Sequence, residues 1–184
     1  TREIAGQFSV KLIAAQRGRG RQMNRGAQAA SGEVLLFLHA DTRLPRTAFA
    51  DIDAALSDPV YLGGRFDVEL DGHHWLLPVI GRMISYRSRL SKVSTGDQAL
   101  FVRREIFQRL GGFQEIALME DIAFCRALKR MGAVACLRSR VISSARRWEM
   151  DGIWRTILRM WVLKLLYFAG VPPARLKQYY ADTR

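Results

Sequence analysis

The chain has 184 residues, and 49% of them are hydrophobic, which fits one domain of ordinary size with a real apolar core. The formal net charge of +12 arises at the ends: residues 1–30 carry six basic and one acidic side chain, and residues 138–184 carry ten and three. Residues 31–137 are neutral, so the excess is local and predicts an anionic partner. No apolar run has the length of a membrane span, and the start lacks both an initiator methionine and a signal-peptide pattern.

The first predicted elements are a strand at residues 8–14 and a helix that reaches about Ala30. Between them lies a basic loop, Arg17-Gly18-Arg19-Gly20-Arg21. The order of strand, flexible loop and helix suits a phosphate, because glycines allow the backbone to approach it and guanidinium groups bind its oxygens in pairs. Arg21 and Asn24 are therefore candidate substrate-binding residues, and the alternative is a solvated run of charge.

The next strand, at residues 34–38, consists of five large apolar residues, so we expect it to be buried on both faces. It ends at His39 and Asp41, which alternate and so project to the same side of the chain. Ligands of open α/β sheets bind at the carboxyl ends of the strands, and this indicates a metal or nucleotide site. Asp41 is the first candidate for a metal ligand. The alternatives are a turn residue for Asp41 and a packed, hydrogen-bonded role for His39.

The rest of the chain alternates between helices and strands. Helices are expected at residues 45–56, 75–90, 103–110, 120–131 and 151–169, and strands at 61–70, 99–102, 133–137 and 140–143. This alternation predicts an α/β fold with a mostly parallel sheet. We assign residues 1–148 to this domain and residues 149–184 to an apolar, basic helical extension.

Two further groups carry candidate chemistry. Glu120 and Asp121 stand at a helix start, where backbone N–H groups keep carboxylates ionised, so either is a candidate general base. The alternative is that both only cap the helix. The basic group Arg146-Arg147-Trp148 is a candidate for closing over a diphosphate, and its alternative is an exposed loop with one anchoring aromatic.

The C-terminal helix is apolar around most of its circumference over residues 153–168, with Arg155, Arg159 and Lys164 as its charges. Packing on its own domain or dimerisation is the first interpretation. Contact with the headgroup region of an acidic membrane is the more specific alternative, because Trp, Tyr and basic residues favour that region. The two cysteines have no partner at metal-binding spacing, which indicates a reduced, cytoplasmic setting, with the inner membrane face as the peripheral alternative.

Together these segments resemble the pattern of glycosyltransferase family 2 on a GT-A nucleotide-sugar-binding fold. They are most similar to the bacterial transferases named for association with radical SAM and selenodomain proteins. The segments, in chain order, are Arg21–Ala27, Val34–Thr42, Gly96–Arg104, Gly111–Phe113, Met119–Asp121 and Arg146–Trp148.

The resemblance implies roles for single residues. Asp41 matches the second acid of the family's Asp-x-Asp motif and would contact a divalent cation, Mg²⁺ or Mn²⁺, while His39 occupies the first acid's position. Asp121 would be the base of an inverting displacement, with Glu120 as a supporting carboxylate. The remaining substrate-binding residues implied by the resemblance are Gly96, Asp97, Arg146, Arg147 and Trp148.

The implied function is transfer of a sugar from a nucleoside diphosphate sugar to an acceptor hydroxyl. Nothing precedes residues 8–14 to supply the family's first strand-helix-strand unit, so we expect an N-terminally truncated chain, and a second copy is expected to fill the open sheet positions as a homo-oligomer. The alternative is a catalytically incomplete remnant that acts as a binding or oligomerisation module. Nucleic-acid binding ranks lowest, because aromatic residues are not interleaved with the N-terminal arginines.

Overall fold

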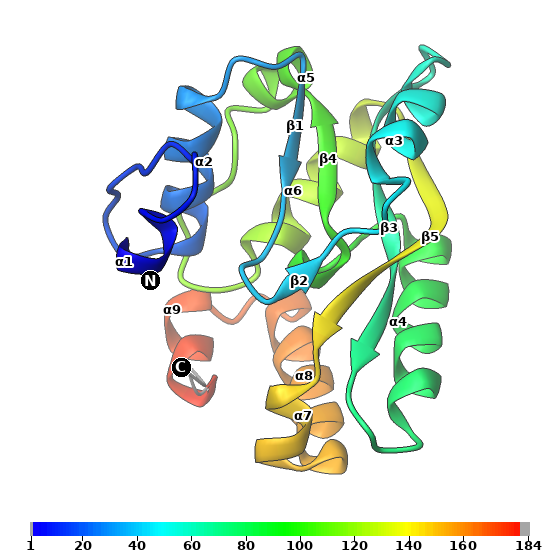
Figure 1. Ribbon diagram of the computed structural model, residues 1–184. Helices are drawn as coiled ribbons and strands as arrows, with labels where there is room; N and C mark the ends of the chain where they lie inside the picture. The colour runs from blue at the N-terminus through cyan, green and yellow to red at the C-terminus, as the bar shows by residue number, and fades with distance from the viewer. Residues whose placement is uncertain (1, 181–184) are drawn as a thin grey trace.

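A computed structural model describes residues 2–180 (Figure 1). The strands are β1 (Val34–Phe37), β2 (Thr42–Arg43), β3 (Tyr61–Asp71), β4 (Leu100–Arg103) and β5 (Ala133–Ser144). The helices are α1 (Arg2–Ala5), α2 (Arg19–Ala29), α3 (Ala48–Leu56), α4 (Leu77–Ser91), α5 (Arg104–Arg109), α6 (Glu120–Met131), α7 (Arg146–Asp151), α8 (Ile153–Phe168) and α9 (Pro173–Leu176). Short 3₁₀ turns lie at Gly96–Gln98 and Lys177–Tyr179.

The strands of the described residues form one sheet in the order β1-β4-β3-β5-β2. The α/β class is confirmed, but the sheet is mixed: β3 and β5 are parallel, whereas the other pairings are antiparallel. The reason lies in the length of α4, about 22 Å against about 36 Å for β3. Because α4 returns along only part of β3, the chain continues in the direction of α4 into β4, which is therefore antiparallel to β3.

The core lies on both sides of β4. Leu100 and Val102 contribute to an apolar cluster with α5 and α6, and Ala99 and Phe101 contribute to a second cluster with α3 and β3. Alternation along a strand explains this division, since successive side chains point to opposite faces. Because β4 lies between β1 and β3, Phe101 and Val102 are fully buried.

Strand β1 is less buried than its sequence predicts. Leu35 alone is buried in it, and the next residue after the strand, Leu38, is 43% exposed. The prediction of a strand buried on both faces is therefore wrong. The cause is its place at the edge of the sheet, where it pairs only with β4 among the described strands.

The predicted strand at residues 8–14 is also wrong. These residues form an exposed, irregular segment, and no strand within residues 2–180 pairs with them. An apolar alternating sequence becomes a strand only where a neighbour satisfies its backbone groups. Two smaller differences concern the C-terminal half: residues 133–144 form the single strand β5, and residues 146–148 begin helix α7 rather than a loop.

The C-terminal helices pack against the rest of the chain. Ile153 and Thr156 are buried at the start of α8, Leu163 is buried in its second half, and Leu176 of α9 joins the same cluster as Leu163. None of the helices in residues 2–180 combines the length and the apolar character needed to cross a membrane.

Candidate active site

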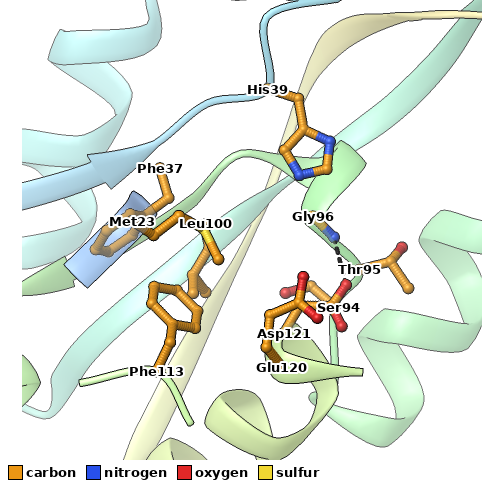
Figure 2. Close-up of a pocket in the computed structure, with 10 residues that line it drawn as sticks. All are labelled: Met23, Phe37, His39, Ser94, Thr95, Gly96, Leu100, Phe113, Glu120 and Asp121. Atoms are coloured by element: carbon orange, nitrogen blue, oxygen red, sulfur yellow. Dashed lines mark hydrogen bonds between the residues drawn. The ribbon is translucent and has the colours of Figure 1, made fainter. Parts of the chain in front are cut away.

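A small pocket lies at the carboxyl end of β1, where the sequence places a ligand site (Figure 2). It is formed by α2, the residues at the end of β1, the segment between α4 and β4, and the start of α6. Its lining residues are Met23, Phe37, His39, Ser94, Thr95, Gly96, Leu100, Phe113, Glu120 and Asp121. The enclosed space is about 10 Å³, which is room for about one water molecule.

The carboxylate of Asp121 is held by two backbone groups. Its Oδ2 accepts a hydrogen bond from the N–H of Gly96 at 2.8 Å, and its Oδ1 accepts one from the N–H of Ile122 at 2.7 Å. Met119, with φ of 69°, turns the chain sharply into α6 and so brings Asp121 to the pocket. The position of this carboxylate is therefore fixed from two elements.

His39 lies directly against Gly96. A Cβ atom at Gly96 would overlap Nε2 and Cε1 of the His39 ring, so only a residue without a side chain lets the ring approach so closely. Figure 2 shows His39 on one side of Gly96 and Asp121 on the other. The structure thus unites three of the candidate residues that the sequence places far apart.

Glu120 is the most buried carboxylate of the site, with 2% exposure. Its Oε1 pairs with Arg19 Nε at 2.8 Å, while its Oε2 has no hydrogen-bond partner among the described residues. Burial raises the pKa of the Glu120 carboxyl, and the neighbouring Arg19 acts against this rise. For Arg19, burial favours a lower pKa, but Glu120, Tyr180 and Asp121 together raise it.

Two basic residues from distant helices complete the electrostatic surroundings. Arg87 of α4 and Lys164 of α8 both interact with the carboxylates of Asp97 and Asp121. Burial and the neighbouring Arg87 lower the pKa of Lys164 to about 8, and burial also lowers the pKa of Arg87. Basic groups from α4 and α8 therefore lie within electrostatic range of the carboxylates of the site.

Sequence reasoning did not select Arg19, Arg87 or Lys164 as site residues. Arg19 is indicated by the sequence, because it belongs to the basic loop before α2. Lys164 is indicated more weakly, as one of the few charged residues on an apolar helix. Arg87 is not indicated, since only the fold brings α4 near the turn at Gly96–Gln98 and the start of α6.

Asp97 occupies the 3₁₀ turn that also contains Gly96. The hydroxyl of Thr95 donates a hydrogen bond to its carboxylate, and the buried Gln98 anchors the turn by donating to Ser88 Oγ at 2.9 Å. The turn is therefore tied to α4 on one side and to Asp121 on the other.

The candidate metal ligand Asp41 lies two residues beyond His39, in the turn between β1 and β2, and is exposed. Its carbonyl oxygen accepts a hydrogen bond from the N–H of Ser144 at 3.1 Å, whereas its carboxylate has no hydrogen bond or ion pair within residues 2–180. Asp41 is not among the residues that line the pocket. Its carboxylate is thus open to solvent near the His39 side of the site.

Arg21 and Asn24 make contacts within the protein. Arg21 pairs with Glu115 at 2.8 Å, and the side-chain amide of Asn24 both accepts from and donates to the backbone of Phe113, at 2.8 Å and 2.9 Å. The nearby Gly20 allows α2 to lie close to the backbone of Gln114, because a Cβ at Gly20 would lie 2.6 Å from the carbonyl oxygen of Gln114. These residues position the loop that carries Phe113 into the pocket.

Arg146, Arg147 and Trp148 lie on α7 and do not line the pocket. Arg146 is exposed, the guanidinium of Arg147 lies 4.5 Å from the ring centre of Tyr180, and Trp148 packs partly against the cluster of α3 and β3. The stacking of Arg147 on Tyr180 is a cation–π contact.

Few side chains near the pocket could bind a divalent cation. Among residues 2–180, no three His, Cys, Asp or Glu side chains come together as a ligand cluster. Mg²⁺ and similar ions are often held by one or two carboxylates together with substrate phosphates and water. The exposed carboxylate of Asp41, which has no protein partner within residues 2–180, fits that mode of binding, and the described residues form no cage built wholly from protein.

A family model described as glycosyl transferase family 2 matches residues 1–111. No curated protein sequence matches the chain. Among solved structures, the chain is similar to the mannosyltransferase PcManGT from Pyrobaculum calidifontis in complex with GDP-Man and Mn²⁺, with a TM-score of 0.61 and 20% identity.

That match covers 97% of this chain and 52% of the mannosyltransferase, so the chain spans about half of that protein's length. At this identity the similarity concerns the fold. It confirms the predicted GT-A-like α/β fold class.

Proposed function

The chain belongs to glycosyl transferase family 2, and from this premise we propose that it transfers a sugar from a nucleoside diphosphate sugar to an acceptor hydroxyl, with inversion at the anomeric carbon. The observation that carries the proposal is the shared pocket of His39, Gly96, Glu120 and Asp121 at the carboxyl end of β1. The placement in the radical SAM-associated subgroup stays a prediction.

In the proposed mechanism Asp121 is the general base. Backbone N–H groups occupy one hydrogen-bonding position on each of its oxygens, and a carboxylate has about four such positions, so it keeps room for the acceptor's proton. As the acceptor oxygen bonds to the anomeric carbon and the bond to the diphosphate breaks, the proton passes to Asp121. Glu120, with its raised pKa, is the supporting carboxylate.

The departing diphosphate gains negative charge, which must be offset for the bond to break. Within the described site, Arg19, Arg87 and Lys164 are the basic groups beside the carboxylates. A bound Mg²⁺ or Mn²⁺ would supply further charge neutralisation, with Asp41 as its protein ligand. Arg146, Arg147 and Trp148 are proposed to contact the diphosphate from α7.

The small volume of the enclosed space sets the location of the donor. A cavity of about 10 Å³ cannot contain a sugar, so the donor is proposed to lie across the mouth of the pocket with its anomeric carbon toward Asp121.

The test combines binding and turnover. Titration of the chain with nucleoside diphosphate sugars, with and without Mn²⁺, measures donor affinity, and nucleoside diphosphate release measures turnover. Asp121→Asn is expected to keep donor affinity and to lower turnover by at least about 100-fold. Asp41→Asn is expected to remove the metal-dependent part of the affinity.

Asp53→Asn is the matched control, because Asp53 is exposed on α3 away from the pocket. Unchanged turnover in Asp121→Asn contradicts the role of Asp121. Absence of binding with every donor favours the alternative, a catalytically incomplete binding or oligomerisation module, for which the edge strand β1 and the exposed apolar residues 8–14 offer a surface.

A further inference from the structure

Helix α4 and the turn before it carry an exposed apolar stripe. Its members recur every three or four residues, which places them on one side of a helix, and each is between 43% and 74% exposed. They are Trp75, Val79, Met83, Tyr86 and Leu90. The opposite side of the helix is buried against β3.

Helix α8 carries a second stripe of the same kind. Its members follow the same spacing, and each is between 57% and 72% exposed. They are Trp154, Leu158, Trp161, Leu165 and Phe168. Val162 widens this stripe to one side.

The two helices lie near each other. Ile84 of α4 and Ile157 of α8 pack in the same apolar cluster, and Arg87 of α4 interacts electrostatically with Lys164 of α8. Both helices begin at the lower end of the molecule and run upward (Figure 1).

The two stripes point to the same side of the molecule. At about 100° per residue, Ile84 and Arg87 follow the centre of the α4 stripe by about 140° and about 80°. Ile157 and Lys164 precede the centre of the α8 stripe by about 60° and about 80°. Since Ile84 and Ile157 pack against one apolar cluster and Arg87 interacts with Lys164, these residues mark the near sides of the two helices, and both stripes then lie on the outer side. We call the combined stripes the α4–α8 surface.

Charge identifies the kind of partner. Neither helix contains an acidic residue, whereas the two helices together contain the basic residues Arg82, Arg87, Arg89, Arg155, Arg159 and Lys164. Arg82 and Arg155 are exposed to solvent and form no ion pair within residues 2–180. A second copy of the chain would bring another surface of the same sign against this one, which disfavours a homodimer through it.

We propose that the α4–α8 surface docks on a lipid bilayer that contains anionic lipids. Trp and Tyr favour the boundary between headgroups and acyl chains, aliphatic side chains enter it, and arginines are attracted by anionic headgroups. The same two helices carry Arg87 and Lys164, which interact with Asp97 and Asp121, so docking holds the candidate site close to the lipid surface. The proposal goes beyond the proposed function and does not depend on it.

The experiment is co-sedimentation of the purified chain with two kinds of vesicle, phosphatidylcholine alone and phosphatidylcholine with phosphatidylserine. The chain is expected to bind the anionic vesicles more tightly. Trp154→Ser/Trp161→Ser is expected to weaken this binding at least about tenfold, since two large apolar side chains no longer enter the boundary. Arg82→Gln/Arg155→Gln is expected to weaken it about fivefold for each arginine removed.

Two exposed residues outside the surface give matched controls. Phe49→Ser removes an exposed aromatic residue from α3, and Arg46→Gln removes an exposed arginine; both are expected to bind like the unmodified chain. If the tryptophan variant does not fold, the arginine variant still tests the proposal. Failure of the unmodified chain to bind anionic vesicles overturns it, and so does equal binding by all variants. A dimer in solution that the tryptophan variant loses assigns the surface to a second copy instead.

Discussion

The backbone N–H of Gly96 donates a hydrogen bond of 2.8 Å to Oδ2 of Asp121, and this bond joins the turn after α4 to the first turn of α6. The turn itself is anchored in the core, because the fully buried Gln98 donates to the carbonyl of Phe66 and to Ser88 Oγ. The position of the proposed base is therefore set by residues that lie about 25 positions earlier in the chain.

Gly96→Ala tests whether the close contact of His39 with this turn matters for function. The new Cβ overlaps the end of the His39 side chain, which can swing away, so we expect little change in thermal stability. Turnover is expected to fall by as much as in His39→Ala. The double variant His39→Ala/Gly96→Ala is expected to be no worse than His39→Ala alone, because both changes act on one contact. Additive losses in turnover would contradict this interpretation.

Asn24→Ala is expected to lower stability more than donor binding. The substitution leaves the N–H and the carbonyl of Phe113 without their side-chain partners, at a cost of about 1–3 kcal/mol in the free energy of unfolding. Urea denaturation measures the change. Gln28→Ala on the exposed side of the same helix is the control, with an expected change within about 0.5 kcal/mol. A loss of donor affinity without a loss of stability would contradict this expectation and support the substrate-binding role that the sequence predicts for Asn24.

The sequence was informative where local pattern decides the structure. The alternation in Tyr61–Asp71 predicted β3, and the apolar spacing after Glu120 predicted α6 with both carboxylates in its first turn. His39 and Asp121 do share a pocket. These features depend on periodicity and on strand ends, which a single sequence displays.

The sequence was misleading where distant partners decide the structure. Residues 8–14 have the composition of a strand but lack a neighbour among the described strands, and β1 has a central strand's composition at an edge position. The direction of β4 depends on how far α4 returns along β3. Likewise, Arg87 and Lys164 come into electrostatic range of the carboxylates only through the packing of their helices, which no local motif records.

The ion pair of Arg19 with Glu120 provides a third prediction. Arg19→Met leaves the Glu120 carboxylate buried without its cation and is expected to cost about 1–3 kcal/mol of stability. The value is below that of a fully buried pair because the Arg19 side chain is 38% exposed. Adding Glu120→Gln to this variant is expected to recover part of the loss, since the uncompensated charge is removed. Additive losses in urea denaturation would show that the two side chains are not coupled.

The pKa of Lys164 gives a pH-dependent prediction. In the folded chain burial and Arg87 lower this pKa to about 8, whereas an unfolded chain has a lysine pKa of about 10.4. Between these values the unfolded state binds more protons, so the free energy of unfolding rises with pH across that window. Relative to Lys164→Met, the unmodified chain is expected to gain up to about 3 kcal/mol of stability as the pH rises from about 7 to 10.5.

Urea denaturation of both proteins over this pH range measures the difference, in which other titrating groups cancel. Asp97→Asn sharpens the test: Asp97 raises the pKa of Lys164, so its replacement is expected to move the onset of the gain to lower pH. If the difference in the free energy of unfolding between the two proteins stays constant from pH 7 to 10.5, Lys164 is not held half-buried near the carboxylates. In that case its proposed contribution to binding the departing diphosphate would also fail.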